Sequence, residues 1–307
     1  MEEIEKLIII GSGPAGLCAA IYAARGELKP LVIAGSVPGG QPSLATEIDD
    51  YPGFPEGVKA PELAQLFWKQ AERFETRFVR EEVKSVDFSK KPFEITTDTK
   101  TLKAKAVIIA TGSSPVWMGL PSEMKLIGRG VSACAVCDGP FFKGKKVAIV
   151  GGGDSALKEA VYLSKIASEV TVVHRREALR AQEALQEQVK SKENVKFIFN
   201  SEVTDVLGDQ KVTGVKIKNN QTGEESALEV EGVFIAIGHK PATDFLKGQV
   251  DLDEKGFVVK TGETQTSVKG VFVAGDVADP KYRQVVTAVG AGAKAALDVE
   301  QYLDTLD

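Results

Sequence analysis

Cysteine and histidine are scarce in this chain of 307 residues, which has three of the former and two of the latter. A structural zinc site needs about four nitrogen or sulfur ligands. Cys18, His174 and His239 stand far apart in sequence, and only Cys134 and Cys137 have ligand-like spacing. We therefore expect no metal site. So few cysteines also argue against a framework of structural disulfides, and they fit the reducing cytoplasm.

Long hydrophobic runs and an excess of basic charge are also missing. No apolar stretch approaches the roughly 20 residues of a membrane-spanning helix, and residues 1–6 are acidic, unlike a signal peptide. Lys and Arg total 38 against 43 for Asp and Glu, without a basic block that could follow a nucleic-acid backbone. The sequence predicts a cytoplasmic protein that binds neither membrane nor nucleic acid.

What is present is an ordinary globular composition, with 43% hydrophobic and 26% charged residues, in a chain long enough for two domains. Cys134 and Cys137 are three positions apart, at a point where the chain can turn into a helix. Such a pair can close a small disulfide, and a helix N-terminus lowers a thiol pKa. Asp138 follows directly and can hold a proton for a departing thiolate. Half of a zinc site and two buried thiols are the alternatives, and we favour a redox pair.

A first nucleotide-binding fingerprint lies near the start of the chain. Residues 6–10 form an apolar, β-branched run typical of a buried parallel strand, and residues 17–25 are typical of an Ala-rich helix. Between them stands G-x-G-x-x-G, whose glycines let the backbone approach a pyrophosphate at the helix N-terminus. The sequence therefore predicts dinucleotide binding by Gly11, Ser12, Gly13, Pro14, Ala15 and Gly16.

Other segments are suited to the same site. The Gly/Pro-rich loop 35–42, with Gly39, Gly40 and Gln41, leads to Asp50, and long loops in compact domains are usually functional. Two apolar strands end in polar or small residues that can close over a dinucleotide. The strand 106–110 is followed by Thr111 and Gly112, and the strand 271–274 is followed by Gly275 and Asp276. Arg283, Gln284 and a small-residue helix over 286–302 come next. A plain surface loop and a plain turn are the alternatives for 35–42 and 275–276. Strand 30–34 ends without the acidic residue that usually binds the adenine-side ribose.

A second fingerprint begins about 140 residues later. An apolar strand, 146–150, is followed by G-x-G-x-x-A and a helix through residue 164, with Gly152, Gly153, Asp154 and Ser155 in the turn. The next strand, 170–173, ends in His174, Arg175 and Arg176, with Arg180 close behind. Guanidinium groups suit a 2′-phosphate because they bind it in a bidentate manner. We predict that NADPH binds here and that His174 has a positional role. The alternative for the arginines is a solvated charge run.

The domain boundaries are expected at two short Pro-containing crossings, residues 113–115 and 239–241. They divide the chain into a discontinuous first domain, 1–113 with 242–307, and an inserted second domain, 114–241. We expect the crossings to act as a paired hinge. Helix 61–74 is expected to offer Leu63, Leu66, Phe67 and Phe74 for an apolar face, and residues 197–217 to alternate as antiparallel strand and turn.

In this order and spacing the motifs resemble the low-molecular-weight, bacterial-type thioredoxin reductases over essentially the whole chain. The resemblance implies an α/β protein with two Rossmann-like domains, the second inserted into the first, of the pyridine nucleotide-disulfide oxidoreductase type. It implies a homodimer with FAD in the first domain, contacted by Gly11, Gly13, Gly16, Gln41, Thr111, Asp276 and Gln284. NADPH would be contacted by Gly153, Arg175, Arg176 and Arg180 in the second. Arg129 matches a thioredoxin-docking position; Val136, Pro42 and Asp50 depart from the family pattern.

The function expected from this resemblance is NADPH-dependent reduction of thioredoxin, through FAD and the pair Cys134 and Cys137 with Asp138. Three alternatives stay open: a reductase of another dithiol carrier or of a peroxiredoxin, an oxidase that forms disulfides in a small molecule, and a flavin-binding protein without turnover. The arginine cluster argues against the oxidase, and the intact Cys-x-x-Cys-Asp argues against the protein without turnover.

Overall fold

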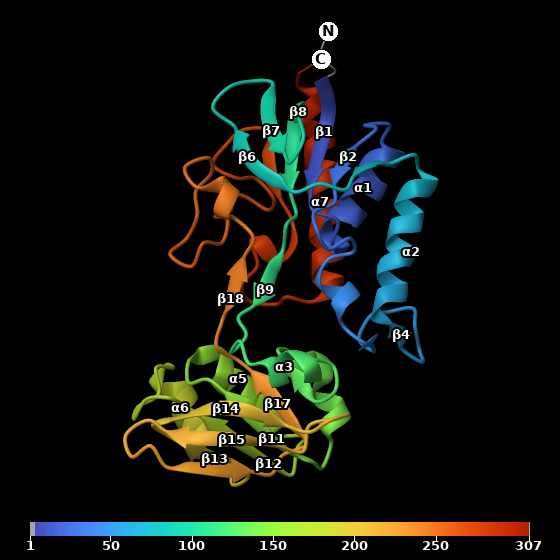
Figure 1. The fold of residues 1–307 in the computed structure, drawn as a ribbon. Helices are drawn as coiled ribbons and strands as arrows, with labels where there is room; N and C mark the ends of the chain where they lie inside the picture. The colour runs from blue at the N-terminus through green and yellow to red at the C-terminus, as the bar shows by residue number, and fades with distance from the viewer. Residues whose placement is uncertain (1–3, 307) are drawn as a thin grey trace. The chain divides into compact units, whose positions relative to one another are not determined.

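The computed structural model describes residues 4–306 and divides into two compact units (Figure 1). The first consists of the chain up to Ser114 and from Lys240 onward, and the second is Pro115–His239. The sequence predicted the domain boundaries after residues 113 and 241. At the crossings, β9 (Ser113–Pro115) pairs with β18 (His239–Pro241).

The first unit is built on a mostly parallel sheet. Its strand order is β5 (Arg77–Val79), β2 (Leu31–Ile33), β1 (Ile4–Ile10), β8 (Thr101–Ile109), β7 (Phe93–Thr97) and β6 (Val83–Asp87). β19 (Val271–Val273) pairs in parallel with the end of β8, whose beginning pairs with β7 in antiparallel fashion. Thus β19, which completes the sheet, comes from the part of the chain that follows the inserted unit in sequence.

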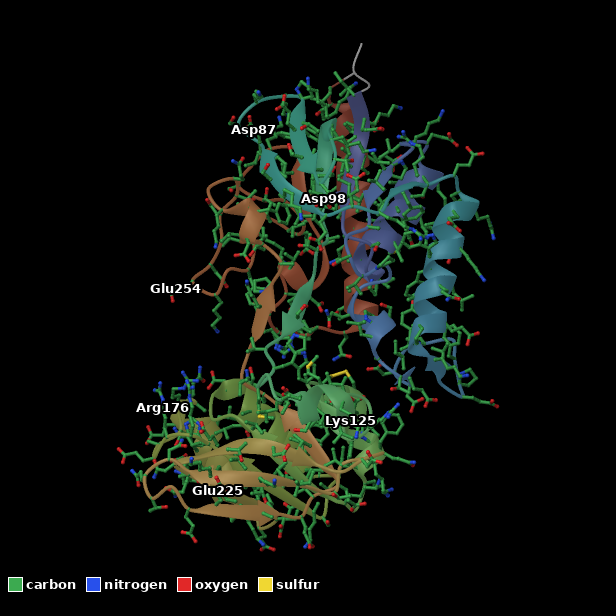
Figure 2. All side chains as sticks on the ribbon, in the orientation of Figure 1. Asp87, Asp98, Lys125, Arg176, Glu225 and Glu254 are labelled. Atoms are coloured by element: carbon green, nitrogen blue, oxygen red, sulfur yellow. A yellow bond between two sulfur atoms is a disulfide. The ribbon has the colours of Figure 1, made fainter. Side chains whose placement is uncertain are left out.

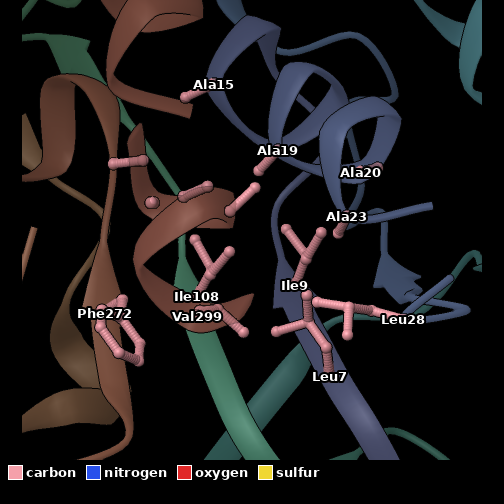
Figure 3. Packing of buried hydrophobic residues seen from close by; sticks show 14 of the residues in the cluster. Leu7, Ile9, Ala15, Ala19, Ala20, Ala23, Leu28, Ile108, Phe272 and Val299 are labelled. Atoms are coloured by element: carbon pink, nitrogen blue, oxygen red, sulfur yellow. The ribbon is translucent and has the colours of Figure 1, made fainter. Parts of the chain in front are cut away.

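Helices cover one face of this sheet. α1 (Pro14–Arg25) and α7 (Val285–Asp304) pack against each other and against β1, β8 and β19. Figure 3 shows Leu7, Ile9, Ile108 and Phe272 of the strands together with Ala19 and Ala23 of α1 and Val299 of α7. A second apolar cluster includes the strand residues Ile8, Ile109 and Phe93, together with residues of β6 and of the segment 245–258. Because both faces are covered, the strands are apolar in continuous runs.

A smaller layer surrounds α2 (Ala60–Arg73), with η1 (Gln41–Leu44) and the pair β3 (Glu47–Ile48) and β4 (Val58–Lys59). Leu63 is buried as expected, and Phe67 and Phe74 are partly buried against the core. The prediction for Leu66 was wrong, because its side chain is 42% exposed. Trp68 instead stacks on Phe78 of β5, with ring centroids 4.0 Å apart.

The second unit has a parallel sheet in the order β10 (Val131–Ser132), β17 (Gly232–Ile235), β11 (Lys146–Val150), β12 (Glu169–Val173) and β13 (Val195–Ile198). α5 (Asp154–Leu163) and α6 (Glu183–Lys190) pack with it, and α3 (Pro121–Leu126) contacts β14. β14 (Ser201–Leu207), β15 (Gly214–Asn219) and β16 (Glu225–Leu228) form an antiparallel sheet. The antiparallel prediction for residues 197–217 was therefore wrong at its start, because residues 197 and 198 belong to the parallel strand β13.

The remaining helical elements are short. They are α4 (Ala135–Asp138), η2 (Gly139–Phe142), η3 (Asp244–Leu246) and η4 (Gly275–Val277). Among residues 4–306, none of the helices combines the length and apolar character needed to cross a membrane.

The contact between α1 and α7 depends on a glycine. A Cβ atom at Gly292 of α7 would overlap the carbonyl oxygen of Ala15 in α1, whereas a Cβ at Gly290 would meet no atom within 4 Å. We expect Gly292→Ala to lower the free energy of unfolding by about 1–3 kcal/mol, because the helices must separate. Gly290→Ala is the matched control and should be neutral or stabilising by up to about 1 kcal/mol. Denaturant titration of both variants measures this, and equal stability of the two would contradict the packing argument.

Candidate functional site

The parallel strands of the first unit end together at one edge of the sheet. The N–H of Gly11, after β1, donates to Ile33 O at 2.8 Å; that of Ala110, after β8, donates to Ile10 O at 2.8 Å. The N–H of Ala274, after β19, donates to Ile109 O at 2.9 Å. This edge therefore carries the residues that the sequence predicts as dinucleotide ligands in three separate segments: 11–16, 111–112 and 275–276.

Glycines allow the segments at this edge to touch. A Cβ at Gly11, whose φ is +113°, would overlap the carbonyl oxygen of Ala110, and one at Gly16 would overlap that of Gly11. A Cβ at Gly40, whose φ is +70°, would lie 2.8 Å from Gly13 Cα. The loop over residues 35–42 is thus folded directly onto the G-x-G-x-x-G turn.

The N-terminus of α1 is suited to a diphosphate. Gly13 is its N-cap, no side chain caps the helix, Pro14 begins it, and its first turn holds no acidic residue. The amide groups of that turn are therefore left for an anionic ligand, which the helix dipole also favours.

Asp276 is the buried acid of this edge. Its Oδ1 atom is buried without a hydrogen-bond partner in the described structure. Burial, reinforced by the charge of Asp279 and opposed by Arg283, raises the pKa of Asp276 to about 7. A buried polar atom without a partner is uncommon in native proteins. The hydroxyl groups of a bound sugar or polyol would satisfy it, so the residues present fit a dinucleotide.

Several other predicted ligands bind neighbouring protein groups in this structure. Ser12 Oγ donates to Ala34 O at 2.8 Å, Thr111 Oγ1 donates to Ala242 O at 2.8 Å, and Gln41 Nε2 donates to Ser114 Oγ at 3.0 Å. Asp50 is exposed and lines an open cavity of about 480 Å³ formed by residues 49–55. Arg283 and Gln284 lie just before and at the N-cap of α7. Whether these side chains contact a cofactor stays a prediction.

The second unit repeats this arrangement. β11 ends at the glycine-rich turn, and a Cβ at Gly151, whose φ is +145°, would lie 2.5 Å from Ala236 O. Gly153 is the N-cap of α5, and a Cβ there would meet no atom within 4 Å. Asp154 Oδ1 accepts the N–H of Gln182 at 2.9 Å, and Ser155 is exposed. The turn therefore presents open backbone at a helix N-terminus, as a bound phosphate requires.

The residues after β12 form what we call the arginine loop, residues 174–180. The side chains of Arg175, Arg176 and Arg180 are exposed, and Figure 2 shows Arg176 at the surface of the second unit. His174 is buried, and burial, with a contribution from the three arginines, lowers its pKa. Its ring is therefore neutral at pH 7. Three guanidinium groups in one exposed loop fit a dianionic phosphate.

Cys134 and Cys137 form a disulfide, with their Cα atoms 5.3 Å apart (Figure 2). β10 ends just before them, and Ser132 Oγ accepts the N–H of Cys134 at 3.0 Å. Cys134 is the N-cap of α4, where its Sγ accepts the N–H of Cys137 at 3.1 Å. The interpretation as two buried free thiols is thus wrong. Within residues 4–306 no group of three or more His, Cys, Asp or Glu side chains is arranged to hold a metal ion.

Cys18 and Arg129 were also singled out from the sequence. Cys18 is 8% exposed in α1, and burial raises its pKa to about 11, which fits a small apolar core residue. Arg129 is exposed, and its backbone carbonyl accepts the N–H of Val212 at 3.0 Å.

Two side chains near the nucleotide-binding edges were not expected from the sequence. The carboxylate of Glu82 bonds to the side chain of Ser36, just beyond β2, where the sequence lacks an acid. The amide of Asn220 bonds to the carbonyl of Arg175 in the arginine loop at 3.3 Å. Glu82 lies between β5 and β6 and Asn220 lies between β15 and β16, so only the strand order, and no local motif, could have revealed them.

Comparison with known proteins agrees with these features. The family model described as pyridine nucleotide-disulphide oxidoreductase matches residues 5–292. The thioredoxin reductase of Streptomyces coelicolor is 49% identical over 309 residues, which cover 100% of this chain and 96% of that protein. A protein of Pseudomonas fluorescens named glucosaminate ammonia-lyase is also 49% identical, over 98% of this chain and 96% of its own length.

A solved structure is similar as well. The crystal structure of thioredoxin reductase from Streptococcus pyogenes matches with a TM-score of 0.95 and 40% identity, over 99% of this chain and 100% of that one. The two Rossmann-like domains expected from the sequence, one inserted into the other, are confirmed by this match and by the family model.

The raised pKa of Asp276 predicts a pH dependence of stability when no nucleotide is bound. Between about pH 4 and pH 7 the folded chain holds a proton on this carboxyl that the unfolded chain has lost. The free energy of unfolding should therefore fall as the pH rises through this range, by on the order of 2–4 kcal/mol. Asp276→Asn should remove that component. Denaturant titrations at pH 5 and pH 7.5 measure it, and an unchanged pH dependence in the variant would contradict the assignment.

Proposed function

The chain belongs to the pyridine nucleotide-disulphide oxidoreductase family and, within it, to the bacterial-type thioredoxin reductases, and from this we propose that it reduces the disulfide of thioredoxin at the expense of NADPH. One observation carries the proposal: Cys134 and Cys137 form a disulfide at the start of a helix, followed directly by Asp138. This redox pair stands in the same unit as the second nucleotide fingerprint.

The disulfide also favours this function over the one that the name of another relative suggests. Similarity alone does not, because the protein named glucosaminate ammonia-lyase is as similar as the reductase of Streptomyces coelicolor. Eliminating ammonia needs no dithiol, whereas passing electrons to a protein disulfide requires one. The cysteine pair therefore favours the reductase.

The family uses FAD and NADPH. The first unit fits FAD through the G-x-G-x-x-G turn at α1, the loop that carries Gly40, and the buried carboxyl of Asp276. The second unit fits NADPH through the open turn at Gly153 and the arginine loop. When bound, these cofactors supply the electron pair, as a hydride from NADPH to FAD and then as two electrons to the Cys134–Cys137 disulfide.

The chain's own residues then complete the exchange. Reduction of the disulfide needs two electrons and two protons and gives two thiols. The N–H of Cys137, which donates to Cys134 Sγ, stabilises a thiolate at Cys134. Asp138, which follows Cys137 in α4, would hold or return a proton there. One thiolate attacks the disulfide of thioredoxin and forms a mixed disulfide, and the other cysteine releases reduced thioredoxin as the internal disulfide forms again.

The partners follow from the same proposal. Thioredoxin is the expected protein substrate, because the similar full-length relatives include proteins of that activity. Exposed Arg129, close in sequence to the redox pair, is the candidate docking residue, together with exposed Val136 between the two cysteines. We propose a homodimer in the cytoplasm: the family resemblance implies the dimer, and the scarcity of cysteines fits a reducing compartment.

We also propose that β9 and β18 are a hinge. The redox pair and the proposed NADPH site belong to the second unit, whereas the proposed FAD site belongs to the first. Both would have to reach the same flavin ring, and we infer that one rigid arrangement does not present both there, so that they reach it alternately. Gly112, next to β9, and Gly238, next to β18, have φ values of +71° and +133°, a region that glycine enters without strain.

Serine substitutions test the role of the cysteines. Cys134→Ser and Cys137→Ser should each lower NADPH-dependent reduction of thioredoxin by at least about a thousandfold, because a dithiol is needed for exchange. Oxidation of NADPH by an artificial electron acceptor should be retained, since this route bypasses the pair. Cys18→Ser is the matched control and should leave both activities intact. Loss of both activities in the Cys134 and Cys137 variants would point to a structural role for the disulfide.

Crystal structures test the hinge. We expect the oxidised protein with FAD alone and its complex with NADP⁺ to differ by a rotation of residues 115–239 about β9 and β18. One crystal form with the nicotinamide and the disulfide both within reaction distance of the flavin would make a rotation unnecessary.

A further inference from the structure

The backbone of the arginine loop is held by groups from outside the loop. The carbonyl of His174 accepts the N–H of Ser201 at 3.1 Å, and the carbonyl of Arg176 accepts the N–H of Asn200 at 3.1 Å. Asn200 has a φ of +51°, a left-handed conformation that asparagine tolerates better than most residues. Main-chain bonds from the start of β14 and the residue before it therefore fix the first part of the loop.

The carbonyl of Arg175, between these two, is held by a side chain instead. Asn220 Nδ2 donates to it at 3.3 Å, while the backbone N–H of Asn220 donates to Asn200 O at 2.6 Å. Asn220 lies in the turn between β15 and β16, which is closed by bonds from the N–H groups of Gln221 and Thr222 to Asn219 Oδ1 at 2.9 and 3.0 Å. The amide of Asn220 is thus presented to the arginine loop by an ordered turn of a different sheet.

The far end of the loop is fixed as well. His174 Nε2 lies 3.1 Å from Ala178 O, and the neutral ring donates this hydrogen bond. The ring packs against Gly152 so closely that a Cβ there would overlap it, and the N–H of Arg180 donates to Gly152 O at 2.8 Å. The carbonyls of residues 174, 175, 176 and 178 are consequently all bonded, and the loop is tied to the glycine-rich turn.

We propose that Asn220 is a positioning residue for the 2′-phosphate of NADPH, acting through the backbone of Arg175 without touching the coenzyme. The inference rests on the proposed use of NADPH. The two arginines that follow β12 have long, exposed side chains, and their direction is set by the dihedral angles of residues 175 and 176. The hydrogen bond to the Arg175 carbonyl holds the backbone from which both side chains extend in one conformation. Less conformational entropy is therefore lost when the two guanidinium groups bind phosphate.

Nucleotide fragments measure this effect directly on the flavin-loaded full chain. We expect Asn220→Ala to weaken the binding of 2′,5′-ADP about 3- to 10-fold, the range for one lost neutral hydrogen bond, and to change 5′-AMP binding by less than about twofold. Isothermal titration calorimetry gives both affinities. Asn220→Asp keeps the size of the side chain but removes the donor, and should show at least the same loss of 2′,5′-ADP affinity.

Gln221→Ala is the matched control, because Gln221 is exposed in the same turn and its side chain forms no hydrogen bond within residues 4–306. It should leave both affinities unchanged. In steady-state assays Asn220→Ala should raise KM for NADPH by a factor similar to the affinity loss, with kcat and the KM for NADH unchanged. A purely structural defect would instead lower kcat, or it would weaken the binding of 2′,5′-ADP and of 5′-AMP by the same factor.

The outcomes separate this inference from the proposed function. One outcome is that the double variant Arg175→Ala, Arg176→Ala no longer binds 2′,5′-ADP more tightly than 5′-AMP, while Asn220→Ala keeps that preference unchanged. The inference is then overturned and the coenzyme assignment stands. Equal loss of 2′,5′-ADP and 5′-AMP binding in Asn220→Ala would also overturn the inference. If the unsubstituted protein binds 2′,5′-ADP no more tightly than 5′-AMP, the assignment of NADPH fails and the inference fails with it.

Discussion

Hydrogen bonding between parallel strands is the constraint on which both nucleotide sites depend. Because β1, β2, β8 and β19 run in the same direction in register, the residues that follow them emerge at one edge. The same holds for β10, β17, β11 and β12 in the second unit. Segments about 260 residues apart in sequence, such as 11–16 and 275–276, thereby come together at one edge of the sheet.

The elements that the sequence predicted well are those in which chemistry and local pattern coincide. Apolar runs at residues 6–10, 146–150 and 170–173 became β1, β11 and β12, because strands covered on both faces have no polar alternation to obscure them. The glycine turns were also predictable, since G-x-G-x-x-G in a strand–turn–helix context has few other uses. The pair Cys134 and Cys137 was expected at a helix start, and Cys134 is the N-cap of α4.

What could not be predicted is set by tertiary neighbours. The spacing of Leu66 in α2 suits an apolar face, yet its side chain is 42% exposed, and Trp68 packs on Phe78 instead. Residues 197 and 198 pair with β12 although the following strands are antiparallel, a choice that alternation alone cannot reveal. Neither Glu82 beside Ser36 nor Asn220 beside Arg175 belongs to a motif, because each acts on a segment more than 40 residues away in sequence.

The insertion of one unit within the other has a consequence for biosynthesis. The second unit, Pro115–His239, is one uninterrupted segment and holds its own sheets and apolar clusters. The first unit needs β19 beside β8 and α7 against α1, which are translated only after that segment. On the ribosome the domain with the redox cysteines is therefore complete first, while α1 leaves the tunnel long before α7, the helix that packs against it.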